Sequence, residues 1–176
     1  MIDLKFFKET GAPLCRHSYP FANKVNPILH RFIQENAIKE DAKVPGTMQT
    51  NFQCDKLASV KEFKLLIEYV RNLILNIPYN NPSFPCKLEL INWWGMVYNK
   101  GQYQNNHNHP PAHWAFVYYV NTPKGSSPLE FSVINKKIFS KAGEVVIFPA
   151  WIYHRVRPNK CNDRSCIVGN FYWKVL

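Results

Sequence analysis

From Lys87 to the end of the chain, short segments rich in aromatic and β-branched residues alternate with turn residues. Aromatic and β-branched residues favour the half-buried surface of a β-strand, and the glycines, prolines and asparagines between them favour turns. Several short strands spaced in this way predict an antiparallel barrel of two facing sheets. The predicted strands are residues 88–98, 114–120, 129–133, 144–148 and 164–173.

Two helices are expected before these strands. In residues 26–33, Asn26 precedes Pro27, as an N-cap precedes a first-turn proline, and apolar residues then recur at helical spacing. In residues 59–77, Ser59 and a glutamate three positions later have the spacing of a capping box that opens an apolar stripe. The sequence therefore predicts a mainly β fold with two helices that buttress the barrel from outside.

Length and composition indicate one globular unit. The chain has 176 residues, of which 46% are hydrophobic and 19% charged, so we expect a single domain and no disordered chain. Within it we expect a helical, mixed part over residues 1–86 and a β-barrel core over residues 87–176. No apolar run approaches the ~18 residues of a membrane span, and no signal peptide opens the chain. Five cysteines without a Cys-x-x-Cys pair indicate reduced thiols. We expect a cytoplasmic protein that binds no membrane.

The chain is basic, with a formal net charge of +10. Such a charge favours acidic ligands, but the basic residues are scattered and form no long run, so specific nucleic-acid binding is not expected. A basic, aromatic barrel that binds single-stranded nucleic acid is the non-enzymatic alternative. Its stacking residues would be Trp93, Trp94, Trp114, Trp151 and Trp173.

Three histidines are candidate metal ligands. His107 and His109 are separated by one asparagine, and side chains two positions apart on a strand project to the same side. Two imidazoles could therefore reach one metal ion. His154 is the best candidate for a third ligand, because it follows a predicted strand that ends at Pro149 and would bring it to the barrel mouth.

With these histidines, the second half of the chain resembles the Fe(II)/2-oxoglutarate oxygenases, and among them small phage-type oxygenases related to prolyl hydroxylases. The resemblance covers about residues 92–172 and rests on several motifs in order. It implies a double-stranded β-helix, a jelly-roll barrel like that of the cupins. The motifs are Tyr98 to Gln102, His107-Asn-His109, Val117-Tyr-Tyr-Val-Asn121, Gly143 to Pro149, His154 and Arg164.

The resemblance also implies cofactors and their residues. It assigns Fe(II) to His107, His109 and His154, although most members carry an aspartate where this chain has His109. It assigns 2-oxoglutarate to Arg164, whose planar guanidinium suits a carboxylate.

Further residues are expected around the 2-oxoglutarate. The resemblance adds Tyr119 and Tyr98 as residues that bind it. Strand parity places Asn170 on the same face as Arg164, so Asn170 is expected to face inward beside the cofactor.

The activity that the resemblance implies is hydroxylation by an Fe(II)/2-oxoglutarate-dependent dioxygenase. The reaction consumes O2 and decarboxylates 2-oxoglutarate to succinate. The substrate cannot be identified from the sequence: it could be a prolyl residue or another peptide group, a nucleotide or a small molecule. Residues 11–58 and 104–114 are expected to contact it, because loops rim the mouth of such a barrel.

The cupins are the alternative family. The spacing of glycines and histidines in this half also fits the two cupin metal motifs, and a cupin uses both histidines of the pair, which would account for His109. Such a protein would be a three-histidine metal dioxygenase or isomerase. The glutamate expected after the pair is missing, and Arg164 would have no assigned role.

Overall fold

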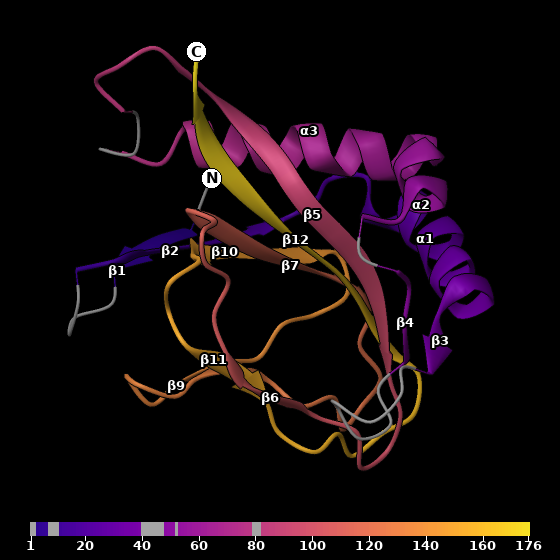
Figure 1. Ribbon diagram of the computed structural model, residues 1–176. Helices are drawn as coiled ribbons and strands as arrows, with labels where there is room; N and C mark the ends of the chain where they lie inside the picture. Colours follow the sequence, from indigo (N-terminus) through magenta and orange to yellow (C-terminus); the bar gives the residue numbers. More distant parts are fainter. Residues whose placement is uncertain (1–2, 7–10, 40–47, 52, 79–81) are drawn as a thin grey trace.

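Two antiparallel β-sheets face each other, and helices cover the outer face of the larger sheet (Figure 1). The computed structural model describes residues 3–6, 11–39, 48–51, 53–78 and 82–176. The predicted mainly β architecture with helices outside is confirmed. Among the described helices, none has the length and apolar character needed to cross a membrane.

In the described part of the chain the larger sheet has eight strands, in the spatial order β1-β2-β10-β7-β12-β5-β4-β3. Four of them precede residue 86 and were not predicted, so the first part of the chain adds strands to the barrel as well as helices. A single domain over residues 1–176 stays a prediction. The strands are β1 Asp3–Phe6, β2 Pro13–Ser18, β3 Ile38–Lys39, β4 Met48–Gln49, β5 Cys86–Tyr98, β7 Trp114–Asn121, β10 Glu144–Pro149 and β12 Arg164–Val175.

Among the described residues the smaller sheet has four strands, in the order β6-β11-β8-β9. They are β6 Gln104–His107, β8 Leu129–Phe131, β9 Lys136–Ile138 and β11 His154–Val156. Only β8 was predicted, because the others are short and largely polar and carry little β-propensity of their own. Pairing with their neighbours therefore determines that they are strands. The five strands that the sequence predicted are β5, β7, β8, β10 and β12.

The predicted helices exist, but both begin at other residues. Helix α1 covers Ala22–Asn36, so Pro27 lies inside it and Asn26 is not its N-cap. Helix α3 covers Lys61–Leu75, and Ser59 does not cap it, because Ser59 closes a short unpredicted helix, α2 Asp55–Ser59. The Ser59 hydroxyl instead donates to the carbonyl oxygen of Lys56 at 2.7 Å.

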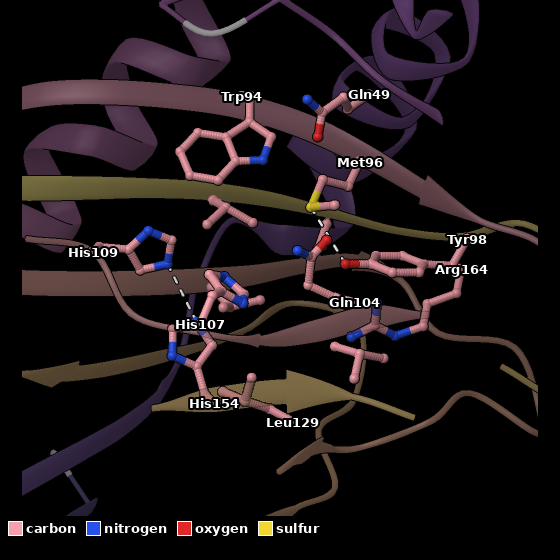
Figure 2. A pocket seen from close by; sticks show the side chains of 14 residues that line it. Gln49, Trp94, Met96, Tyr98, Gln104, His107, His109, Leu129, His154 and Arg164 are labelled. Carbon is pink, nitrogen blue, oxygen red and sulfur yellow. Dashed lines mark hydrogen bonds between the residues drawn. The ribbon is translucent and has the colours of Figure 1, made fainter. Parts of the chain in front are cut away.

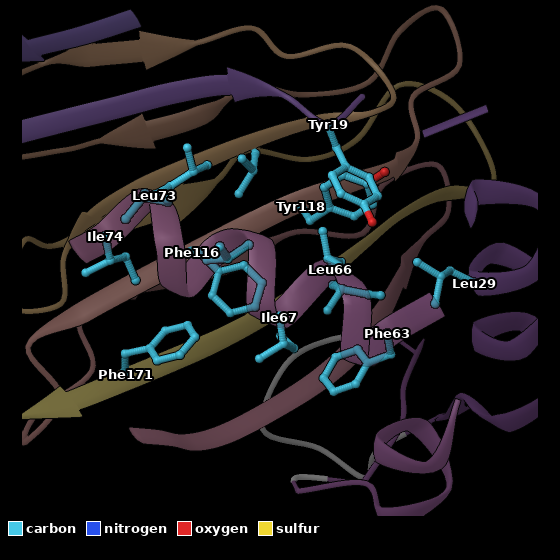
Figure 3. Packing of buried hydrophobic residues seen from close by; sticks show 14 of the residues in the cluster. Tyr19, Leu29, Phe63, Leu66, Ile67, Leu73, Ile74, Phe116, Tyr118 and Phe171 are labelled. Carbon is cyan, nitrogen blue, oxygen red and sulfur yellow. The ribbon is translucent and has the colours of Figure 1, made fainter. Parts of the chain in front are cut away.

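The helices and the larger sheet share one apolar core (Figure 3). The buried stripe of α3, which includes Leu66 and Ile67, packs over Phe116 of β7 and Phe171 of β12. This stripe is the one that the sequence pattern predicted. Its burial removes apolar surface from water and fixes α3 against the sheet.

Helix α1 approaches the same sheet closely at Gly95 of β5. A Cβ atom on Gly95 would come within 2.6 Å of Cγ1 of Ile33, which is buried on α1. Only a residue without a side chain allows this contact, so Gly95 sets how near α1 lies to β5.

We expect Leu66→Ala to destabilise the fold by about 2–5 kcal/mol, because it leaves a cavity under a fully buried side chain. Urea unfolding followed by circular dichroism measures the loss. The matched control is Leu65→Ala on the same helix, where the side chain is 50% exposed. Equal losses for the two variants would contradict the described packing of α3.

Candidate functional site

The alternation of side chains along β12 gives the larger sheet two different faces. Ile167 and Phe171 point to the helices and belong to the outer core. Arg164, Cys166 and Val168 point the other way and line a cavity between the two sheets. Strand β12 therefore contributes side chains both to the hydrophobic core under the helices and to the cavity.

His107, His109 and His154 meet at one end of this cavity (Figure 2). One ring nitrogen of each lies within 4.8 Å of the others. His107 and His154 lie opposite each other in the register of β6 and β11. His109 lies beyond the end of β6, and its backbone N–H donates to the carbonyl of Ala150 at 2.9 Å. The alternation of side chains along a strand therefore does not account for the position of His109. The backbone contact with Ala150 holds it near His107 and His154.

The three imidazoles are poised to be neutral ligands. Burial lowers the pKa of His154 to about 3 and that of His109 to about 4, and it also lowers the pKa of His107. The Nδ1 atoms of His107 and His154 donate to the backbone carbonyls of Asn105 and Ile152 at 2.8 and 2.9 Å. These bonds fix the proton on Nδ1, so that each Nε2 carries a lone pair that can bind a metal. In this structure Nε2 of His154 accepts a hydrogen bond from Nε2 of His109.

The spacing of these nitrogens fits one metal ion. Nε2 of His109 lies 3.2 Å from Nε2 of His154. Two nitrogens bound at right angles to one ion, each at ~2.1 Å, would be ~3.0 Å apart. Within the described residues this cluster consists of histidines alone and includes no carboxylate.

Arg164 lies at the opposite end of the cavity (Figure 2). Its side chain is buried at 1% exposure, and its Nε and Nη1 atoms have no hydrogen-bond partner among the described residues. The neighbouring carboxylate of Asp163 points to the other side of the sheet, where His30 and Gln34 bind it. A buried cation without an acidic partner is costly unless a ligand supplies the negative charge.

Two tyrosines surround the guanidinium of Arg164. Its Cζ atom lies 4.6 Å from the ring centroid of Tyr98 and 5.5 Å from that of Tyr119. Burial raises the pKa of Tyr119 to about 12 and also raises that of Tyr98, so both hydroxyls keep their protons. The hydroxyl of Tyr119 is buried and has no partner in the described part of the chain, whereas that of Tyr98 donates to Sδ of Met96 at 3.4 Å.

Between its two ends the cavity, of about 220 Å³, is mostly apolar. Of the side chains that line this middle part, the sequence assigned a ligand role only to Trp94, as a stacking residue of the nucleic-acid alternative. Gln49 and Gln104 both fall in segments expected near the mouth, residues 11–58 and 104–114, although no motif singles out either of them. Pairing of β4 with β5 brings Gln49 to the cavity. The residues between the ends are Gln49, Trp94, Met96, Gln104, Val117, Leu129, Val156, Cys166 and Val168.

Asn170 does not line this cavity. It keeps the parity of Arg164 on β12, but six residues separate the two, about 20 Å along an extended strand. Its side-chain nitrogen donates to Oδ1 of Asn92 at 2.5 Å. The expectation that Asn170 lies beside Arg164 is therefore wrong.

The tryptophans form no continuous aromatic groove. Trp94, Trp114 and Trp173 are buried in the two cores, and Trp93 is half-buried. Only Trp151 of the five is exposed. Stacking of several bases on this surface is therefore not supported.

Comparison with known proteins gives a partial sequence match and full-length structural matches. Residues 92–140 match a family model described as "Putative 2OG-Fe(II) oxygenase". This segment contains Tyr98, the His107 and His109 pair and Tyr119. No curated protein sequence matches the chain.

Among solved structures, a viral collagen prolyl hydroxylase from Paramecium Bursaria Chlorella virus-1, in complex with 2-oxoglutarate, matches with a TM-score of 0.68. It shares 14% identity over 93% of this chain and 96% of that one. A Pseudomonas putida prolyl-4-hydroxylase matches with a TM-score of 0.64 and 14% identity, over 93% and 92% of the chains. A Trichoplax adhaerens prolyl hydroxylase, in complex with a peptide fragment of the hypoxia inducible factor, matches with a TM-score of 0.64 and 14% identity. The match covers 90% of this chain and 83% of that one.

At 14% identity these structural matches establish the shared fold alone, the double-stranded β-helix of the 2-oxoglutarate oxygenases, which confirms the predicted fold class. A phage source finds no support in them. The resemblance inferred from the motifs is confirmed: this chain is similar, in sequence over residues 92–140 and in fold over most of its length, to the 2OG-Fe(II) oxygenases related to prolyl hydroxylases.

Proposed function

We propose that this chain is an Fe(II)- and 2-oxoglutarate-dependent dioxygenase that hydroxylates its substrate. The observation that carries the proposal is the buried guanidinium of Arg164, which has no acidic partner among the described residues and lies across one cavity from three neutral histidines. A small dicarboxylate suits such a cavity, because one end can bind a metal and the other can neutralise the guanidinium. 2-Oxoglutarate has this chemistry.

His107, His109 and His154 would hold the metal through their Nε2 atoms. Imidazole suits Fe(II), and Mn, Co or Ni ions can serve as surrogates in binding experiments. When bound, Fe(II) supplies the oxidising chemistry of the family, in which O2 and 2-oxoglutarate are consumed, succinate and CO2 form and the substrate gains a hydroxyl group.

Arg164 would hold the distal carboxylate of 2-oxoglutarate through two parallel hydrogen bonds. The free hydroxyl of Tyr119 would donate a third. The ring of Tyr98 stabilises the guanidinium by a cation–π contact. The apolar middle of the cavity would exclude water from the bound dicarboxylate.

For the substrate, we propose a prolyl residue of a peptide as the first class to test. Several structural neighbours are prolyl hydroxylases, and one of them is bound to a peptide. The net charge of +10 equally suits an acidic peptide, a nucleotide or a small acid. We further propose a cytoplasmic location and a single domain.

A cupin-type three-histidine dioxygenase or isomerase is the second candidate function. The all-histidine cluster favours it, because a cupin uses both histidines of the pair as metal ligands, although the glutamate that the cupin motif expects is missing. It gives no role to the buried Arg164, so binding of 2-oxoglutarate distinguishes the two candidates.

The proposed activity is tested by loading the protein with Fe(II) and 2-oxoglutarate without oxygen, adding O2 and measuring succinate, with and without proline-containing peptides. We expect His107→Ala and His154→Ala to abolish both succinate formation and Mn(II) binding, measured by calorimetry. His113→Ala is the control, because that imidazole lies outside the cluster and accepts a bond from the backbone of Trp173. Folded His107→Ala and His154→Ala proteins with full metal stoichiometry would show that the metal site lies elsewhere.

Arg164→Ala is expected to weaken 2-oxoglutarate binding at least ~30-fold while metal affinity stays close to that of the wild type. Removing one partner of a buried charge-assisted pair costs roughly 2–5 kcal/mol. Arg164→Lys is expected to recover only part of the affinity, because an ammonium group cannot reproduce the fork of two hydrogen bonds. Calorimetry on the metal-free protein measures the dissociation constant of Mn(II), and calorimetry on the Mn(II)-loaded protein measures that of 2-oxoglutarate. An unchanged dissociation constant for 2-oxoglutarate would favour the cupin function.

His109→Asp distinguishes an oxygenase that tolerates histidine from chemistry that requires it. An aspartate would add an anionic ligand, so we expect the variant to bind Fe(II) more tightly and to keep 2-oxoglutarate turnover. Metal titration and the succinate assay measure the two effects. Loss of turnover with the metal still bound would show that the reaction requires three histidines, whereas His109→Ala with unaltered metal stoichiometry would remove His109 from the ligand set.

A further inference from the structure

Three polar residues of helix α1 face the larger sheet at intervals of four: Asn26, His30 and Gln34. Residues four apart lie on one side of a helix, so these three form a polar stripe along α1. They contact the sheet beside the buried apolar residues of the same helix, such as Ile33. We call Asn26, His30 and Gln34 the α1 polar stripe.

His30 binds both residues that flank Arg164. Its Nε2 lies 3.1 Å from Oδ2 of Asp163, and its Nδ1 lies 2.8 Å from Oγ of Ser165. In a neutral imidazole, Nε2–H donates to the carboxylate, and Nδ1 accepts from the serine hydroxyl. Gln34 adds a bond of 3.0 Å from its amide nitrogen to the other carboxylate oxygen of Asp163.

Asn26 binds both residues that flank Tyr119. Its side-chain nitrogen donates to the backbone carbonyl of Val120 at 2.9 Å. Its side-chain oxygen accepts a bond of 2.5 Å from the hydroxyl of Tyr118. The same helix face thus holds the neighbours of both inward-pointing residues, Arg164 and Tyr119.

Successive side chains of a strand point to opposite faces of the sheet. Contacts made by α1 with residues 163, 165, 118 and 120 therefore constrain the backbone that carries Arg164, which lines the cavity, and Tyr119, whose ring lies beside the guanidinium of Arg164. The backbone of Asp163 has a φ of +64°, a left-handed conformation that few non-glycine residues adopt, and contacts from neighbouring side chains hold it there. Asn99 accepts from the backbone N–H of Asp163, and Asn121 donates to its carbonyl, at 3.0 and 2.8 Å.

We infer that the α1 polar stripe consists of positioning residues for 2-oxoglutarate. From the far side of the sheet, the stripe sets the guanidinium of Arg164 and the hydroxyl of Tyr119 so that both can meet one carboxylate. The inference rests on the proposed function, because it assigns the stripe to that same site. None of the three residues touches the cavity, so the stripe acts only through the residues that it holds.

The test compares His30→Ala, Asn26→Ala and the control Ile33→Val in the full chain. Calorimetry gives the dissociation constants of Mn(II) and of 2-oxoglutarate with Mn(II) present, and thermal unfolding gives the stability of each variant. We expect His30→Ala to weaken 2-oxoglutarate binding roughly tenfold, with Asn26→Ala in the same direction and Mn(II) binding unchanged. Ile33→Val loses a buried methyl group from the same helix without a polar contact, so it should lower stability but leave 2-oxoglutarate binding unchanged.

A conservative variant of His30 and a double variant with Arg164 distinguish a residue that positions Arg164 from one that only docks the helix. His30→Gln should recover part of the affinity, because its amide nitrogen can still donate to Asp163. In an Arg164→Lys background, His30→Ala should weaken binding much less, since a residue that acts through Arg164 loses its effect with the guanidinium. In steady-state assays, His30→Ala should raise the KM for 2-oxoglutarate more than it lowers kcat.

Two results would overturn the inference. The first is that 2-oxoglutarate binds wild type and His30→Ala equally well, or that Ile33→Val weakens 2-oxoglutarate binding as much as His30→Ala does when the two variants lose the same stability. In either case the stripe only docks the helix. This result would leave the proposed function intact. If wild type itself binds Mn(II) but no 2-oxoglutarate, the proposed function fails, and the inference fails with it.

Discussion

The structure depends on strand β12, which pairs with β5 along one edge and with β7 along the other. Because side chains alternate along a strand, each of these three strands presents apolar residues to the helices and a second set to the cavity. The outer set is buried by α1 and α3, which stabilises the sheet. The inner set can then include groups that a hydrophobic core does not tolerate, such as the guanidinium of Arg164.

Two electrostatic environments within one small cavity define its chemistry. At one end, burial keeps three imidazoles neutral, and backbone carbonyls fix the tautomers of His107 and His154. At the other end, Arg164 keeps its positive charge without an acidic partner in the described chain. Elsewhere in the barrel a buried charge has partners within the chain, since Glu130 forms ion pairs with both Arg155 and Arg157. This contrast supports the proposal that a ligand neutralises Arg164.

Helix α1 combines two tasks that follow from its position. Ile33 packs onto Gly95 of β5 and brings the helix close to the sheet, and this closeness allows side chains as short as asparagine to reach the strands. His30 can then contact the residues on both sides of Arg164. Burial of an apolar face and placement of polar contacts are thus properties of one helix, and both lie on the side of the sheet away from the cavity.

The sequence by itself determined the five strands with strong β-propensity, the apolar stripes of two helices, and the residue types of the site, because these depend on local pattern and on motifs in order. Tertiary structure alone decided the short polar strands such as β6, which form only by pairing, and the start of α1, where packing places Pro27 inside the helix. It also selected Gln49 from the long segment expected near the mouth, through pairing of β4 with β5. It left Asn170 outside the cavity, because parity fixes a face of a strand but not a position along it. The unpaired state of Arg164 could be seen only in the fold, since a sequence does not show which charges find partners.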